Sequence, residues 1–210
     1  MKIAVIGKGN VGATLGGRWA HTGHEVVFGV RDPQDDKVIG LLHAIRSNAR
    51  AATVPAAAAS AEVVVLATPW DAAQEVVLNM EDLTGKILVD CTNPLRPDLG
   101  GLTIGHTTSA AERIAGWAPG ARVVKAFNCT GSGNMAKPAY REGALSMFLC
   151  GDDAEAKSTV GRLAADIGFD VVDAGPLASA RYLEPLAMLW IHLAYAQRMG
   201  PDIGFRLMRR

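Results

Sequence analysis

Short apolar runs alternate with amphipathic stretches along the chain. The runs are rich in β-branched residues and are bounded by Gly, Pro or charged residues, which is typical of strands buried on both faces of a sheet. They predict eight strands, at 3–6, 24–29, 51–54, 62–67, 86–90, 122–127, 145–150 and 170–173. The stretches between them predict helices at 10–20, 55–61, 70–80, 108–117 and 152–167. This alternation indicates right-handed βαβ crossovers and an α/β fold with a doubly wound, mostly parallel sheet.

The last part of the chain has a different pattern. Residues 181–198 predict a helix with apolar side chains around most of its circumference: Leu183, Leu186, Met188, Leu189, Trp190, Leu193 and Tyr195. A helix that is apolar on all sides must be covered on all sides. We therefore expect a Rossmann-type domain at 1–178 and a C-terminal helical segment at 179–210 that forms a homodimer interface, with the helix swapped or packed across the two-fold axis.

Composition narrows the class of protein. The chain has 210 residues, 49% of them hydrophobic, with 21 basic and 21 acidic residues and no formal net charge. We expect neither a nucleic-acid nor a membrane partner, because no basic cluster would attract one, and the longest apolar stretch, 186–196, is too short to span a bilayer. Cys91, Cys129 and Cys150 are widely spaced, which favours reduced thiols in a cytoplasmic protein.

The clearest motif follows the first predicted strand. Gly7, Gly9 and Gly12 form a G-x-G-x-x-G turn between a strand and a helix, with Asn10 and Val11 inside it. In such a turn the first glycine permits the bend, the second lets a pyrophosphate approach the backbone, and the third lets the helix pack on the strand. Free N–H groups at the helix start would face the phosphates. The alternative is a glycine-rich turn that binds nothing.

The end of the second strand selects between NAD and NADP. NAD-binding folds of this kind usually have an acidic residue there, whereas this strand ends in Val30 and Arg31. A guanidinium can hydrogen-bond a 2′-phosphate and stack on adenine, so NADP is favoured. Lys37 is a weaker candidate for the same phosphate. Alternatively, Arg31 pairs with a neighbouring aspartate on a solvated loop.

Polar residues also follow the later strands, at the edge where such sheets bind ligands. Thr68, Asn93 and Asn128 offer short polar side chains for ribose and the nicotinamide amide, and Pro69 and Pro94 stiffen their loops. The predicted cofactor-binding residues are Gly7, Gly9, Asn10, Val11, Gly12, Val30, Arg31, Lys37, Thr68, Pro69, Trp70, Asn93, Pro94, Asn128, Cys129 and Thr130.

Candidates for acid–base, nucleophilic or metal chemistry are scarce. No spacing of His, Cys or carboxylates predicts a metal site, and Ser109 with Glu112 matches a helix-capping box rather than a nucleophile. Of the histidines, we expect His21 and His24 at the surface and His43 on a helix. His192 fits a buried core position. For His106, a position facing the cleft stays an open alternative. Hydride transfer between two cofactors needs orientation and a dry site more than an acid or base, so this scarcity suits redox chemistry.

Several segments resemble a known family. The glycine turn, residues 23–31, Ala-Thr-Pro-Trp at 67–70, Val-Lys-Ala-Phe-Asn at 124–128, residues 150–157 and Asp-Ala-Gly-Pro-Leu at 173–177 look like the NADP-dependent oxidoreductases of the deazaflavin coenzyme F-420. They also resemble the NADPH domain of membrane metalloreductases, which reduces a flavin. In the coenzyme F-420 enzymes a Ser-Arg pair holds the 2′-phosphate; here Arg31 is retained and Val30 replaces the serine.

The resemblance implies hydride transfer between NADP(H) and coenzyme F-420, or the flavins FMN or FAD. It places the deazaflavin over the nicotinamide near residues 128–135 and the segment 199–207. Two alternatives stay open. One is a non-catalytic NADP(H)-binding redox sensor. The other is an imine or carbonyl reductase resembling the pyrroline-carboxylate reductases, which use a large helical C-terminal domain for substrate that we do not expect the segment 179–210 to provide.

Overall fold

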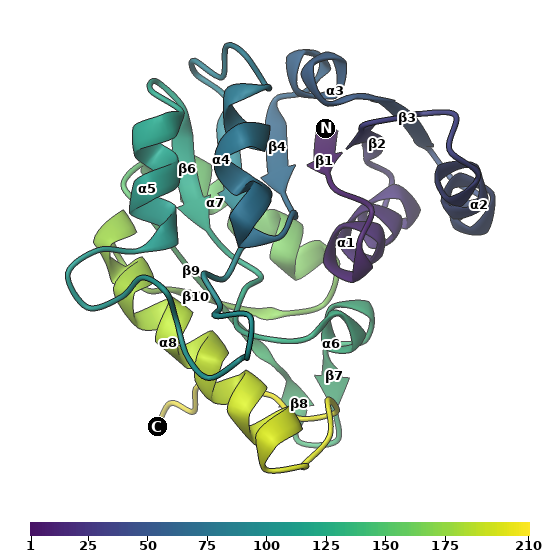
Figure 1. Ribbon diagram of the computed structural model, residues 1–210. Helices are drawn as coiled ribbons and strands as arrows, with labels where there is room; N and C mark the ends of the chain where they lie inside the picture. Colours follow the sequence, from purple (N-terminus) through teal and green to yellow (C-terminus); the bar gives the residue numbers. More distant parts are fainter.

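The computed structural model describes residues 1–210 and is built on one eight-stranded sheet (Figure 1). The strand order is β10-β9-β6-β5-β4-β1-β2-β3. The strands are β1 (Lys2–Ile6), β2 (Glu25–Val30), β3 (Ala49–Thr53), β4 (Val63–Leu66), β5 (Ile87–Asp90), β6 (Arg122–Lys125), β9 (Ser146–Gly151) and β10 (Asp170–Asp173). All eight predicted strands are confirmed, with ends that differ by a few residues.

One strand runs against the others. The pairs from β3 through β6 are parallel, but β9 pairs antiparallel with β6, with Lys125 opposite Cys150, and β10 is parallel to β9. The chain between β6 and β9 stays at the carboxyl edge of the sheet, where it forms the short helix α6 (Ser132–Ala136) and a hairpin of β7 (Ala139–Tyr140) and β8 (Gly143–Ala144). Because no crossover helix returns the chain to the opposite edge, β9 re-enters in the reverse direction.

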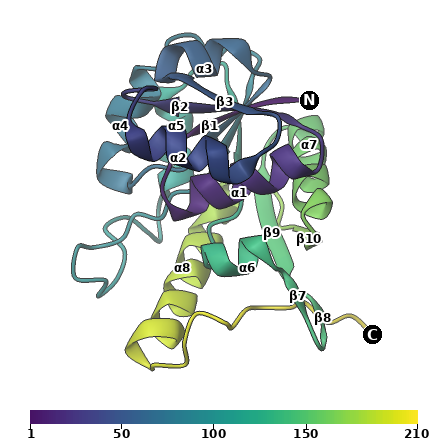
Figure 2. The same ribbon diagram turned by 90° about the vertical axis from the view of Figure 1, so that its right-hand side faces the viewer.

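Helices cover both faces of the sheet (Figures 1 and 2). Alternate residues of β1 supply the two cores: Ile3 and Val5 belong to a cluster of 29 buried residues, and Ala4 and Ile6 to a cluster of 22. The first cluster is covered by α1 (Asn10–His21), α2 (Asp36–Ile45) and α7 (Ala154–Asp166), and the second by α3 (Val54–Ser60), α4 (Trp70–Leu78), α5 (Ala110–Trp117) and α8 (Ala180–Ile191).

The sequence prediction sets no bounds for α2 and misses α6, β7 and β8. Helix α2 contains His43, which was expected on a helix, and it buries only Val38 and Ile45. Asp35 caps it, with a side chain that accepts a hydrogen bond from the backbone N–H of Lys37. The elements α6, β7 and β8 have five, two and two residues, which is too short for a periodic pattern.

Helix α8 is confirmed but ends earlier than predicted. It passes into a π-helical turn at His192–Ala196, and the remaining chain runs back towards the β7–β8 hairpin (Figure 2). The expected burial on all sides is not found within one chain, because Tyr182 is 77% and Leu189 47% exposed. One apolar face of α8 is therefore uncovered.

The final residues are held against the sheet by hydrogen bonds. The backbone N–H of Ser146 donates to the carbonyl of Phe205 (3.0 Å), and that of Leu207 donates to Ser146 Oγ (3.0 Å).

None of the helices has the length and apolarity needed to span a bilayer. Cys91, Cys129 and Cys150 are free thiols and are buried, as the sequence predicts.

Candidate cofactor site at the carboxyl edge of the sheet

The three glycines of the turn between β1 and α1 meet different surroundings. Gly7 has a φ of +114°, and a Cβ there would lie 2.6 Å from the carbonyl oxygen of Ala67. A Cβ on Gly12 would lie 2.3 Å from the carbonyl oxygen of Gly7. A Cβ on Gly9 would meet nothing within 4 Å. The protein itself therefore requires Gly7 and Gly12, whereas Gly9 leaves an open space that suits a pyrophosphate.

The start of α1 offers free donors to that space. The first hydrogen bond of the helix runs from the N–H of Ala13 to the carbonyl of Gly9 (2.8 Å), and no side chain caps the helix. The N–H groups of Asn10, Val11 and Gly12 consequently have no partner within the helix. These groups and the helix dipole favour an anion at this position.

A cavity of about 350 Å³ opens beside the glycine turn. It lies between the ends of β1, β2 and β4, and its lining includes Gly7, Val30, Arg31, Thr68 and Pro69. Arg31 is exposed and forms no hydrogen bond or ion pair, so the alternative in which it pairs with a neighbouring aspartate is not found. Val30 is buried and contributes only apolar wall.

Two charged residues at this cavity were missed by the sequence analysis. Lys8 Nζ donates to Asp35 Oδ1 at 2.7 Å, and both residues line the cavity beside Arg31. The hydrogen bond from Lys8, with one from the N–H of Lys37, lowers the pKa of Asp35. The side chain of Lys37, which we predicted as a second phosphate ligand, is exposed and lies outside the cavity lining. The pattern of strands and helices along the chain does not predict the contact between Lys8 and Asp35, because these two residues belong to different loops.

The residues after β4 divide between the cavity and the core. Thr68 Oγ1 is buried without a hydrogen-bond partner in the protein, as expected for a hydroxyl that hydrogen-bonds a ligand when one is bound. Pro69 also lines the cavity. The ring of Trp70, in contrast, stacks on that of Trp117 with the centroids 5.4 Å apart, so it joins α4 to α5.

The residues after β5 and β6 lie together at the same edge. Asn93 Nδ2 donates to the carbonyl of Asn128 (3.0 Å), and Asn128 Nδ2 donates to Asn93 Oδ1 (3.1 Å) and to the carbonyl of Leu183 (3.0 Å). The structure thus brings Asn93 and Asn128 together, as the sequence predicts for neighbouring strands. Pro94 and Cys129 are buried, and burial raises the pKa of the Cys129 thiol to about 11. The hydroxyl of Thr130 accepts a hydrogen bond from Asn134 (2.8 Å).

The C-terminal segment forms a wall next to these residues. The carbonyl of Ile203 accepts hydrogen bonds from Asn134 Nδ2 (2.7 Å) and Trp190 Nε1 (2.7 Å). Gly131 packs directly on the Trp190 ring, since a Cβ there would lie 2.6 Å from it. Segments 128–135 and 199–207, which the resemblance places around an acceptor, are therefore neighbours.

Two histidine predictions are wrong. His24 was expected at the surface but is buried, with Nε2 at 3.1 Å from Asp166 Oδ2 on α7. His192 was expected in the core but is exposed, because it lies in the π-helical turn beyond α8. His21 and His43 are exposed, and His106 lines a shallow hollow of about 480 Å³ with Pro185 and Met188.

Ser109 caps α5 as predicted, because its side chain accepts a hydrogen bond from the N–H of Glu112 (3.2 Å).

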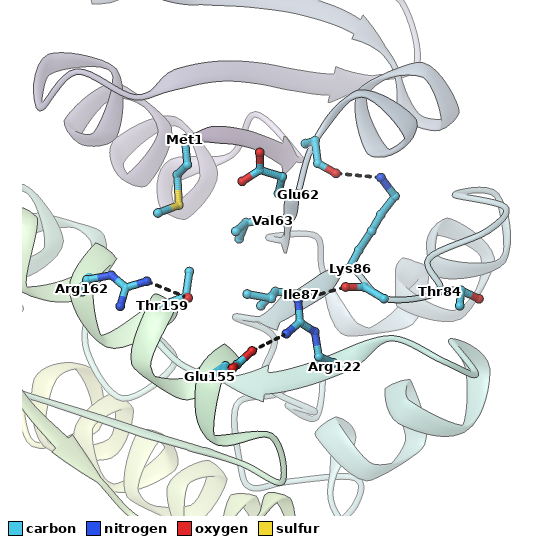
Figure 3. Close-up of a pocket in the computed structure, with 12 residues that line it drawn as sticks. Met1, Glu62, Val63, Thr84, Lys86, Ile87, Arg122, Glu155, Thr159 and Arg162 are labelled. Carbon is cyan, nitrogen blue, oxygen red and sulfur yellow. Dashed lines mark hydrogen bonds and ion pairs between the residues drawn. The ribbon is translucent and has the colours of Figure 1, made fainter.

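A larger hollow, of about 550 Å³, lies at the opposite, amino-terminal edge of the sheet (Figure 3). Two of its cationic groups already have protein partners: Lys86 Nζ donates to the carbonyls of Ala59 and Ala61, and Arg122 donates to that of Gly85 and lies near Glu155. Parallel sheets of this type bind nucleotides at the carboxyl ends of their strands. The smaller cavity at the glycine turn is therefore the candidate cofactor site.

This geometry defines the class of protein. An uncapped helix start behind a glycine turn, with an unpaired arginine at the next strand, is the arrangement of a Rossmann-type NADP-binding oxidoreductase. The nicotinamide, when bound, donates or accepts the hydride, and the protein contributes binding and orientation. No group of three or more His, Cys, Asp and Glu side chains is placed to hold a metal ion.

Comparison with known proteins gives the family. The family described as "NADP oxidoreductase coenzyme F420-dependent" matches residues 2–94. The "F420-dependent NADP reductase" of Methanothermobacter thermautotrophicus is 33% identical over 225 residues, covering 99% of this chain and 94% of that protein. The chain belongs to this family of NADPH-dependent oxidoreductases, as its motifs predict.

Other relatives agree with this assignment. The metalloreductase STEAP3 of Rattus norvegicus is 34% identical over 190 residues, and this chain spans only 37% of its length. The crystal structure of a putative F420-dependent NADP reductase from Arthrobacter sp. FB24 matches with a TM-score of 0.91 and 35% identity over the whole of both chains. A reductive aminase from Aspergillus terreus shares the fold alone, with a TM-score of 0.68 and 19% identity.

Proposed function

We propose that the protein transfers a hydride between NADP(H) and the deazaflavin coenzyme F-420. The observation that supports NADP(H) most directly is the free Arg31 guanidinium at the cavity beside the glycine turn. A 2′-phosphate there would receive charge-assisted hydrogen bonds. Lys8 lies close enough to contribute a second positive charge, although its present partner is Asp35.

The acceptor would lie between segments 128–135 and 199–207. Trp190, Gly131 and the carbonyl of Ile203 bring these segments into contact, so they form a continuous wall beside the Asn93–Asn128 pair. A planar deazaflavin stacked on the nicotinamide needs such a preformed surface more than it needs an acid or base. The names of two full-length relatives support coenzyme F-420 as the acceptor.

We further propose a homodimer in which a second copy covers the free face of α8. Tyr182 and Leu189 are separated by seven positions and lie on one side of the helix, exposed in the single chain. A second copy would bury them and enclose the acceptor side. Sedimentation equilibrium tests this part, and a monomer at micromolar concentration would contradict it.

The acceptor is tested by following NADPH oxidation with coenzyme F-420, FMN, FAD, a ferric chelate and a cyclic imine in parallel. We expect turnover with coenzyme F-420 above that with the flavins. The Gly12→Ala variant, whose added Cβ would distort the glycine turn, serves as the negative control. Turnover of the imine alone would instead favour the imine reductase alternative. Tight NADPH binding without turnover of any acceptor would favour the redox sensor.

A further inference from the structure

Three ionisable side chains meet inside the protein, away from the cavity at the glycine turn. Lys125 on β6 places its Nζ 2.8 Å from Asp90 Oδ2 on β5 and 3.0 Å from Glu184 Oε1 on α8. The side chains of Lys125 and Asp90 are 0% exposed and that of Glu184 is 1% exposed. Buried ion clusters contribute little net stability, because desolvation opposes the attraction between the charges. A role other than stability is therefore worth seeking.

The cluster fixes the loop that follows β5. Lys125 Nζ also donates to the backbone carbonyl of Thr92 (2.6 Å), and Asp90 Oδ1 accepts a hydrogen bond from the Thr92 N–H (2.8 Å). Both backbone polar groups of Thr92 are thus bound by the cluster. Thr92 directly precedes Asn93, so the cluster determines where the Asn93 side chain starts.

The other asparagine follows a strained turn next to Lys125. Phe127 has a φ of 65°, in the left-handed region that bulky residues rarely adopt, and it is fully buried. Such strain persists only where the surroundings determine the conformation, and it concentrates at functional sites. The turn directs Asn128 back towards Asn93, with which it exchanges hydrogen bonds.

Glu184 connects the cluster to α8 and α5. Its carboxylate accepts hydrogen bonds from the N–H groups of Ala110 (3.0 Å) and Ala111 (3.3 Å) at the start of α5. The preceding residue, Leu183, accepts the hydrogen bond from Asn128 through its carbonyl (3.0 Å). Helix α8 is therefore joined to the Asn93–Asn128 pair at two adjacent residues.

Electrostatics keep Lys125 charged. Burial by itself lowers the pKa of its ammonium group, but the carboxylates of Asp90 and Glu184 outweigh that effect and the pKa is raised. Burial raises the pKa of Glu184, against the opposing influence of Lys125 and the Ala110 N–H. The lysine thus retains all three donors for its carboxylate and carbonyl partners.

We infer that Lys125, together with Asp90 and Glu184, positions the two sides of the hydride-transfer site relative to each other. It fixes the Asn93–Asn128 edge expected beneath the nicotinamide and holds α8, which leads to the acceptor wall, against that edge. This inference rests on the proposed function. Lys125 touches neither cofactor and acts through Thr92 and Glu184, so it is a positioning residue.

The decisive experiment compares two variants. Lys125→Met alone leaves two carboxylates buried without their cation and should unfold at a much lower temperature. The neutral variant Asp90→Asn/Lys125→Met/Glu184→Gln removes all three charges and should regain much of that stability. We nevertheless expect its hydride transfer, measured as kcat in steady state and as the single-turnover rate, to fall at least tenfold, because small displacements of reacting groups are costly. Its NADPH dissociation constant should change little, since the adenosine end is untouched.

A control is Lys86→Met at the opposite edge, where the lysine donates to two backbone carbonyls and has no carboxylate partner. It should leave hydride transfer unchanged. Wild-type kcat in the neutral variant would overturn the inference and make the cluster purely structural. If the neutral variant does not fold, Glu184→Gln tests the same point, with a lower kcat at unchanged NADPH affinity expected and an unchanged kcat contradicting it.

A readout without an acceptor separates this inference from the proposed function. The fluorescence of bound NADPH reports the surroundings of its nicotinamide ring. We expect the emission spectrum of NADPH bound to the neutral variant to shift towards that of free NADPH. An emission spectrum equal to that of the wild type would overturn the positioning role, whereas failure of every acceptor with the wild type would overturn only the proposed function.

Discussion

Two parts of the same sheet edge prepare for a cofactor in opposite ways. Between β1 and β2 several polar groups are free: Arg31 has no partner and the first N–H groups of α1 are uncapped, although Lys8 is paired with Asp35. After β5 and β6, in contrast, the two asparagine side chains are already engaged, because Asn93 and Asn128 bind each other and the main chain. The first part is built to recognise a ligand through side chains and N–H groups, whereas the second is built to hold its own shape.

The difference changes how the asparagines are understood. The sequence suggests two amide side chains that reach for ribose and nicotinamide. In the structure their first hydrogen bonds join two loops, with the buried cluster beneath them. We therefore propose that this part contributes mainly a rigid surface, and that affinity comes mainly from the part between β1 and β2.

The largest effect on binding is expected from Arg31→Ala. Loss of charge-assisted hydrogen bonds to a 2′-phosphate should weaken NADPH binding by about 1.5–3 kcal/mol, roughly 10- to 150-fold, and leave NADH binding nearly unchanged. Calorimetric titration of both nucleotides measures this, with Arg113→Ala, an exposed arginine on α5, as the control. An equal loss for NADH and NADPH would mean that Arg31 stacks on adenine without reading the phosphate.

The glycine turn offers the next comparison. Gly12→Ala should lower the free energy of unfolding by about 1–3 kcal/mol, because its Cβ would overlap the carbonyl of Gly7. Gly9→Ala should change it by less than about 0.5 kcal/mol, since nothing in the protein lies near that Cβ. Both variants should lose NADPH affinity. Denaturant unfolding and NADPH titration test the pair, and full affinity in Gly9→Ala would remove the pyrophosphate from this position.

Asn128→Ala tests the other side of the comparison. It leaves the carbonyl of Leu183 and Oδ1 of Asn93 without their donor, so the free energy of unfolding should fall by about 1–3 kcal/mol. NADPH affinity should fall by less than in Arg31→Ala. Asn48→Ala, at an exposed position, is the matched control. A loss of NADPH affinity without a loss of stability would show that Asn128 primarily binds the cofactor. It would contradict the proposed contrast between the two parts of the sheet edge.

A smaller effect is expected from the ion pair between α5 and α8. Arg181 donates to both carboxylate oxygens of Glu112, at 2.9 and 2.6 Å, and this hydrogen bonding lowers the pKa of Glu112. A lowered pKa means stability that is present above the ordinary pKa of glutamate, about 4.3, and is lost as the pH falls through the folded-state value. Glu112→Gln should thus lower the melting temperature slightly at neutral pH and not at acidic pH. Glu155→Gln, almost fully exposed, should show no such dependence.

The sequence predicts best what is encoded locally. The strand, glycine turn and helix at residues 3–20 are consecutive, and each supports the others, so the phosphate turn can be inferred without a structure. The capping of α5 by Ser109 is local in the same way. Periodicity likewise identifies every strand of the main sheet.

Contacts between distant segments could not be predicted. The reversal of β9 depends on the path of the preceding chain and not on the residues of the strand, whose apolar pattern fits either direction. His24 contacts Asp166 of α7, which lies 142 positions away, and Lys8 contacts Asp35 across two loops. The Lys125 cluster likewise combines residues of β5, β6 and α8, and none of them has a distinctive local pattern.

The uncovered face of α8 has a consequence for enzymology. If a second copy buries Tyr182 and Leu189, the wall that faces the acceptor would be complete only in the assembled form. Specific activity would then decrease as the enzyme is diluted below its dissociation constant for self-association. When the diluted enzyme is concentrated again, activity would return after a lag. Assays at nanomolar enzyme would underestimate turnover. Adding Arg31→Ala protein, at an NADPH concentration too low to saturate that variant, would restore activity to dilute wild-type enzyme by forming mixed pairs.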